Sequence, residues 1–105
     1  MDTQFLEPWT QVGEFASNLV DELKREVIEG HSLYGKSAVA IAQRVDSDDV
    51  LFTLDDGTAY AVVHLTWNGE PEQSTKWPET KLFSTFEEWQ RLGMTVDHKE
   101  FIGSS

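Results

Sequence analysis

The apolar residues in the first part of the chain follow the spacing of one helical face. They recur three or four positions apart from Trp9 onward, at Val12, Phe15, Ala16, Leu19, Val20, Leu23, Val27 and Ile28. Residues at this spacing form a single stripe along an α-helix. Thr10 is a suitable N-cap, and Gly30 suits the left-handed position that follows a last helical turn. The pattern predicts a long amphipathic helix over residues 10–29.

Three shorter runs in the middle of the chain have the alternation typical of β-strands. They cover residues 37–45, 50–55 and 58–67 and are separated by aspartate-rich turns. Bulky side chains alternate there with small or polar ones, as they do when successive residues point to opposite faces of a sheet. Asp56 and Gly57 join the last two runs, and both residue types tolerate the positive φ of a type I′ hairpin turn. We expect a three-stranded antiparallel meander that is covered on both faces.

The last part of the chain predicts a fourth strand and a short helix. Residues 80–83 form another strand-like run, and Ser84 or Thr85 follows it as an N-cap. Ser84 and Glu87 have the spacing of a capping box, in which each side chain bonds the backbone N–H of the other residue. Gly93 is placed to end this helix. The tail, residues 94–105, carries enough apolar residues to dock as a last strand.

Together these elements predict one α+β domain over residues 1–105. In it a long N-terminal helix packs on a three- to five-stranded antiparallel meander sheet, with a short second helix near the C-terminus. A chain of 105 residues is long enough for one core and too short for a second domain. We therefore expect any site on this sheet–helix unit or at an interface between copies.

The charge of the chain restricts its partners. Eight lysine and arginine residues stand against nineteen aspartates and glutamates, which gives a formal net charge of -11. This surface has no basic stripe to neutralise phosphates, so neither nucleic acid nor an anionic membrane is an expected partner. A protein with a basic surface is the partner that the charge favours.

The composition also bears on the compartment. The chain has no cysteine, which removes disulfides, thiolate metal sites and thiol catalysis. Its first residues lack the basic and apolar regions of a secretory leader, and no apolar run has the length of a membrane span. A reducing compartment is compatible with these features. We expect a cytoplasmic protein.

His64 is the residue best suited to acid–base chemistry, because an imidazole exchanges protons near neutral pH. Tyr60 and Thr66 share its face of the predicted strand, and Trp67 and Tyr34 would bound a pocket there. No nucleophile or second base is spaced to His64, so no catalytic residue is assigned. A histidine satisfied by a neighbouring carboxylate or backbone group is the simpler interpretation.

No metal or cofactor is predicted. His31, His64 and His98 lie in separate elements without the short spacing of zinc ligands. The acidic turn over residues 46–49 lacks the glycine and the distal glutamate of a calcium loop, so its aspartates are interpreted as turn residues. The glycines do not form a loop of the kind that cradles phosphate.

The segment after the third strand concentrates aromatic and acidic residues. Trp67 and Trp89 are expected to pack in an aromatic core, since large aromatics mostly serve packing. Trp77 precedes Pro78 in a polar stretch and is expected to be partly exposed. An exposed aromatic beside carboxylates is typical of an interface anchor. The candidate partner-binding residues are Glu70, Glu72, Trp77 and Glu79.

Several short motifs in this region occur in a fixed order. The strand end reads VVHLTWxG from Val62 to Gly69, and Glu72, WPxT from Trp77 to Thr80 and FEEW from Phe86 to Trp89 follow it. In this order the motifs resemble a small bacterial family of conserved, uncharacterised domain proteins, over residues 33–89. The resemblance implies a compact bacterial domain and attaches no activity, ligand or site residue to it.

Two functions remain open from the sequence. The first is a non-enzymatic acidic protein-interaction module, for example an immunity-type inhibitor that binds a basic partner. The alternative is a small-molecule-binding protein or enzyme with a pocket around Tyr60, His64 and Thr66. A homodimer through a sheet edge or the long helix is a further arrangement.

Overall fold

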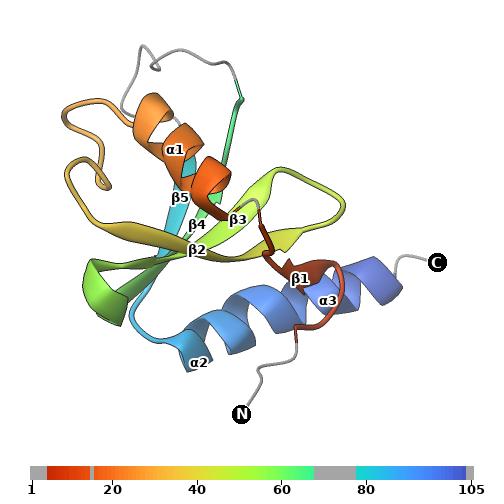
Figure 1. Ribbon diagram of the computed structural model, residues 1–105. Helices are drawn as coiled ribbons and strands as arrows, with labels where there is room; N and C mark the ends of the chain where they lie inside the picture. Colours follow the sequence, from red (N-terminus) through yellow and green to blue (C-terminus); the bar gives the residue numbers. More distant parts are fainter. Residues whose placement is uncertain (1–4, 15, 68–77, 104–105) are drawn as a thin grey trace.

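The computed structural model describes residues 5–14, 16–67 and 78–103, and its centre is a five-stranded sheet (Figure 1). Every neighbouring pair of strands is antiparallel, and the strands lie side by side in the order of the chain. Their bounds are Trp9–Gln11 for β1, Ala38–Arg44 for β2, Asp49–Leu54 for β3, Ala59–His64 for β4 and Glu79–Phe83 for β5. The predicted meander is therefore present, with β1 as an additional edge strand.

The prediction of a long N-terminal helix was wrong. The chain begins instead with β1, in which Trp9 lies opposite Arg44 of β2, and the helix α1 covers only Ala16–Glu26. Pairing with β2 satisfies those backbone groups of residues 9–11 that face β2, and the Trp9 side chain is buried to 2% exposure. The same apolar spacing thus serves two elements, a short strand and a three-turn helix.

One face of the sheet is covered by α1 (Figure 1). Leu19 and Leu23 of this helix pack on Phe52, Val63 and Leu65 in the first core cluster. Burial of each such side chain contributes roughly 1.5–3 kcal/mol relative to its exposure to water. The helical hydrogen bonds continue to Val27, whose N–H donates to the Leu23 carbonyl, and Gly30 then takes a left-handed φ of 99°.

The other face is covered by the C-terminal part of the chain. The helix α2 (Phe86–Trp89) continues through a π-helical stretch, Gln90–Met94, into α3 (Thr95–Ile102), and the three form one helical segment (Figure 1). This C-terminal helix packs on the second core cluster, here called the aromatic core. Its buried members are Trp9, Ala42, Leu51, Trp89 and Met94, and its half-buried members include Phe5, Tyr60, Phe83 and Phe86.

The prediction of a short second helix that ends at Gly93 was also wrong, as was the docking of the tail as a strand. The helix begins after Thr85, one of the two expected caps, whose hydroxyl accepts a hydrogen bond from the Glu88 N–H at 3.0 Å. The predicted capping box of Ser84 and Glu87 was wrong, because it is Glu88 whose side chain accepts the Ser84 N–H. The helix then passes through Gly93, and a Cβ at this position would lie 2.8 Å from Trp89 Cδ1. Gly93 makes room for the indole and does not end the helix.

The hairpins show two further differences from the expected pattern. A 3₁₀ turn, Asp55–Gly57, joins β3 to β4, and both Asp55 and Gly57 have positive φ. A bulge in β2 places Ala40 in the first core cluster and Ala42 in the aromatic core, although both have the same parity in the sequence. Over the ranges given above, no helix combines the length and the apolar character needed to cross a bilayer.

Candidate functional site

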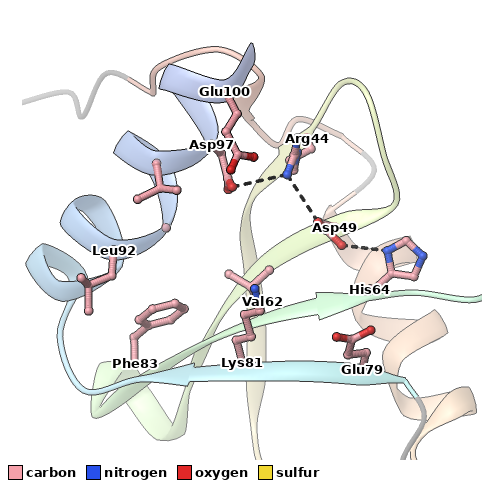
Figure 2. A pocket seen from close by; sticks show the side chains of 12 residues that line it. Arg44, Asp49, Val62, His64, Glu79, Lys81, Phe83, Leu92, Asp97 and Glu100 are labelled. Carbon is pink, nitrogen blue, oxygen red and sulfur yellow. Dashed lines mark hydrogen bonds and ion pairs between the residues drawn. The ribbon is translucent and has the colours of Figure 1, made fainter. Parts of the chain in front are cut away.

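A cleft of about 480 Å³ lies between the C-terminal helix and strands β2 to β5 of the sheet (Figure 2). This volume lies within the range of about 300–1,000 Å³ that is typical of sites for small ligands. The strands contribute Arg44, Asp49, Val62, His64, Glu79, Lys81 and Phe83 to its lining, and the helix contributes Leu92, Gly93, Val96, Asp97 and Glu100.

The strand wall of the cleft is built on three cross-strand rows, whose members line the cleft except for Leu51, Thr53 and Tyr60. The first row crosses β3, β4 and β5 as Asp49, His64 and Glu79, the second as Leu51, Val62 and Lys81, and the third as Thr53, Tyr60 and Phe83. Residues two apart in a strand share a face, so all three rows face the C-terminal helix. From the first row to the third the wall changes from charged to largely apolar.

Arg44 forms ion pairs with three aspartates at the end of the cleft that is uppermost in Figure 2. Its Nε and Nη2 each lie 2.8 Å from a carboxylate oxygen of Asp46, and its Nη1 lies 3.7 Å from Asp49 Oδ2 and 3.5 Å from Asp97 Oδ1. The hydrogen bond with Arg44 lowers the pKa of Asp46. The same bond, with the charges of all three aspartates, raises the pKa of Arg44 against the effect of its partial burial. This guanidinium is therefore already satisfied within the fold.

Asp97 joins the two walls of the cleft. It lies on α3, and its Oδ2 accepts a hydrogen bond of 2.8 Å from the indole Nε1 of Trp9 on β1. The other oxygen of Asp97 faces Arg44 on β2 (Figure 2). One carboxylate thus fastens the helix to two strands of the sheet.

His64 stands at the rim of the cleft and is half exposed. Its Nδ1 lies 2.8 Å from Asp49 Oδ1 (Figure 2). An ionised carboxylate can only accept, so the proton of this bond is carried by Nδ1, and in the neutral imidazole Nε2 is left as an acceptor. The arrangement orients the imidazole.

Glu79 and Glu100 line the cleft from opposite walls, and Lys81 lies between the charged and the apolar row. Within the part of the chain that the structure describes, none of these three side chains has an oppositely charged partner at ion-pair distance. Among the described residues, four carboxylates and two permanent cations line the cleft. These described side chains carry two negative charges in excess when His64 is neutral.

Of the predicted partner-binding residues, the structure places Glu79 in this cleft, exposed at the start of β5. Glu70, Glu72 and Trp77 lie outside the described residues. Trp67, expected in the aromatic core, is instead 48% exposed and has a left-handed φ of 56°. Its place beside Trp89 is taken by Trp9, whose ring meets that of Trp89 edge-on at a centroid distance of 5.2 Å.

The predicted ligand pocket is brought together only in part. His64 lines the cleft, whereas the Tyr60 ring packs against Phe86 in the aromatic core at a centroid distance of 5.7 Å. Thr66 follows the end of β4, where its backbone N–H is bound by Glu26 on the α1 side. Tyr34 lies near α1 in a separate shallow groove beside Leu23 and Val27.

Two buried carboxyl groups form a second polar cluster, on the inner face of α1. Glu26 accepts the backbone N–H groups of Thr66 and Trp67 at 2.9–3.0 Å, and Arg25 pairs with Glu22. Burial raises the pKa of Glu26, and its hydrogen bond with Glu22 raises it further. This cluster joins α1 to the end of β4.

The other histidines make bonds within the fold. His31 is buried, with its Nε2 3.0 Å from the Pro78 carbonyl and its Nδ1 accepting the Leu33 N–H. His98 Nδ1 lies 2.6 Å from the Glu7 carbonyl. Where the structure describes the chain, no three histidine or acidic side chains are grouped so that they would hold a metal ion.

The sequence interpretation missed most of the cleft. Arg44, Asp49, Lys81, Asp97 and Glu100 were not assigned to any site. Arg44 two residues before Asp46 at a hairpin turn was an available signal for an internal ion pair. Asp97 and Glu100 had no such signal, because the tail was not expected to be helical.

Comparison of the chain with protein-family models, with curated proteins and with solved structures gives no match in any of the three.

Proposed function

We propose that this chain is a non-enzymatic acidic interaction module and that the cleft is part of the surface with which it binds a basic protein. The observation that carries the proposal is the pair of carboxylates, Glu79 and Glu100, which line one cleft without a cation partner in the described part of the chain. Arg44 does not neutralise them, because its contacts are with three aspartates.

The charge of the whole molecule acts in the same direction. A net charge of -11 attracts a basic protein over a distance of about one Debye length, roughly 8 Å at physiological salt. Such steering raises the rate of association, and the contacts in the cleft then select the orientation. An immunity-type inhibitor that covers a basic enzyme in the bacterial cytoplasm is the specific version of this proposal.

The test is a titration of the ¹⁵N-labelled protein with a hexa-arginine peptide, followed by NMR. We expect shifts of the amide signals at Glu79, Lys81, Val96 and Glu100 that diminish as salt is added. Glu79→Gln and Glu100→Gln should each weaken binding about two- to fivefold, the range of an exposed ion pair. Glu29→Gln removes one exposed carboxylate that does not line the cleft and is the matched control.

Two results would contradict the proposal. One is the absence of any salt-dependent shift in the cleft. The other is an equal loss of affinity in Glu29→Gln and in the two cleft variants, which would mean that the peptide recognises only the total charge.

The alternative, a small-molecule-binding protein or enzyme, is favoured by the orientation of His64. Its Nδ1 is held by Asp49 at the rim of a cleft whose size suits a small ligand. In this case His64→Gln should abolish ligand binding or turnover, whereas binding of hexa-arginine should change little. Unchanged ligand binding in His64→Gln would remove the alternative.

A further inference from the structure

The cleft is polarised, and both of its walls are polarised in the same direction. Along β5 the side chains change from the acidic Glu79 through Lys81 to the apolar Phe83. Along the helix they change from the acidic Glu100 and Asp97 to the apolar Leu92. Arg44 pairs with Asp97 of the helix and with Asp49 of β3, so it connects the helical and the strand wall at the acidic end of the cleft. Figure 2 shows Phe83 and Leu92 at the opposite end.

The apolar end is open to an occupant. Leu92 is 54% exposed and Val96 is 44% exposed, although both side chains line a cleft between packed elements. A second apolar side chain placed against them would be removed from water, at about 25 cal/mol for each Å² covered. An occupant that carried only charge would leave this end wet.

From these features we infer that the partner presents a basic side chain with an apolar side chain next to it. The basic group lies at the acidic end of the cleft, which Glu79 and Glu100 line from opposite walls, and the apolar group lies on Phe83 and Leu92. This inference rests on the proposed function and adds the chemical identity of the partner segment.

Arginine is the basic residue that the acidic end suits best. Its guanidinium presents five N–H donors in a plane and can serve carboxylates on more than one side, whereas a lysine ammonium is a compact point charge. Arg44 shows this arrangement within the fold, since one guanidinium faces Asp46, Asp49 and Asp97 at once. Lys81 repels a second cation from the middle of the cleft and so restricts the basic group to the acidic end.

The inference is tested with three blocked dipeptides: acetyl-Leu-Arg-amide, acetyl-Leu-citrulline-amide and acetyl-Gly-Arg-amide. Citrulline keeps the shape of arginine without its charge, and glycine removes the apolar group. By NMR titration we expect Leu-Arg to bind about fivefold more tightly than either of the others, which is about 1 kcal/mol for each end of the cleft.

Two variants locate the two ends. The double variant Glu79→Gln/Glu100→Gln should lower the affinity for Leu-Arg to that for Leu-citrulline, and should leave Leu-citrulline unaffected. Leu92→Ala should lower the affinity for Leu-Arg to that for Gly-Arg, and should leave Gly-Arg unaffected. Leu82→Ala is the matched control, because Leu82 is 55% exposed, almost as much as Leu92, and does not line the cleft.

The outcomes separate this inference from the proposed function. Equal affinities for Leu-Arg and Gly-Arg, or equal effects of Leu92→Ala and Leu82→Ala, overturn the polarised recognition. Binding of hexa-arginine without binding of any dipeptide overturns it as well, and in each case the proposed function stands. Failure of hexa-arginine itself to bind in the cleft overturns both.

Discussion

The indole of Trp9 donates a hydrogen bond to the carboxylate of Asp97, and these residues are 88 positions apart in the chain. Trp9 lies on the first strand and Asp97 on the last helix, so this hydrogen bond connects the first element of the fold to the last. Arg44 shares the same carboxylate. The helical wall of the cleft is therefore placed by a contact that also belongs to the aromatic core.

Asp97→Ala is expected to lower the free energy of unfolding by about 1–3 kcal/mol, because it removes the acceptor of a partly buried indole N–H and one partner of Arg44. Asp97→Asn keeps an oxygen for Trp9 and should cost less. Both are measured by urea denaturation, with Asp21→Ala on the exposed side of α1 as the control, expected within about 0.5 kcal/mol of wild type. Equal losses in Asp97→Ala and Asp97→Asn would show that the hydrogen bond to Trp9 contributes nothing.

Gly93→Ala is expected to destabilise the protein in spite of the better helix propensity of alanine. Propensity favours the substitution by about 1 kcal/mol. The new Cβ would lie 2.8 Å from Trp89 Cδ1, and this fully buried ring cannot move away without disturbing Trp9. Overpacking of this kind costs about 1–3 kcal/mol of stability, so the steric cost should exceed the gain from helix propensity.

The control for that substitution is Gly13→Ala, because no atom of the described residues lies within 4 Å of a Cβ at Gly13. Thermal unfolding and the near-ultraviolet circular dichroism of the tryptophans measure both variants. A Gly93→Ala variant as stable as wild type, with an unchanged spectrum, would refute the steric explanation.

The buried carboxyl pair on α1 predicts a pH dependence of stability. Because the pKa of Glu26 is raised in the folded state, its contribution to stability is fully present below the unfolded value, about 4.3, and is lost as pH rises through the raised value. Glu22→Gln replaces the neighbouring carboxyl by an amide that can donate to Glu26. We expect this variant to be more stable than wild type at pH 7, by on the order of 1 kcal/mol, and to lose less stability between pH 4 and 7.

Urea denaturation across that pH interval measures this effect, and Glu29→Gln serves as an exposed control of the same charge change. A difference between Glu22→Gln and wild type that stayed constant with pH would mean that the pair does not exchange a proton in this range.

Lys81→Met is expected to change binding in the opposite sense to the glutamate variants. It removes the cation in the middle row of the cleft and keeps an unbranched side chain that is one heavy atom shorter. Affinity for hexa-arginine should rise about two- to fivefold at low salt, and the gain should shrink as salt is added. Lys99→Met on the exposed part of α3 is the control. Weaker binding in Lys81→Met would place the peptide outside the cleft.

Much of the sheet was predictable from local signals. The alternation in residues 37–45, 50–55 and 58–67 anticipated β2, β3 and β4, and the turn residues between them anticipated antiparallel neighbours. Thr85 was one of the two helix caps that could be predicted from the sequence. Capping requires only a hydroxyl that accepts a hydrogen bond from the N–H three residues later. Signals of this kind act over a few residues and do not depend on the rest of the fold.

The first element and the last could not be predicted in the same way. Residues 9–12 fit a helical stripe, but they pair with β2 because this pairing lets Trp9 reach Trp89 and Asp97. Gly93 has the appearance of a helix end, yet it permits the close approach of the Trp89 ring. Each outcome depends on a partner far away in the chain.

The sequence by itself determined the charge, the absence of cysteine, the strands of the meander and the cap of the second helix. Only the tertiary structure decided that Glu79 and Glu100 would line one cleft, that Arg44 would be satisfied by its own aspartates, and that Trp67 would be exposed. The physical reason is that burial and ion pairing are properties of surfaces in contact. The surfaces of this cleft come from four strands and a helix, and the aromatic core holds them together.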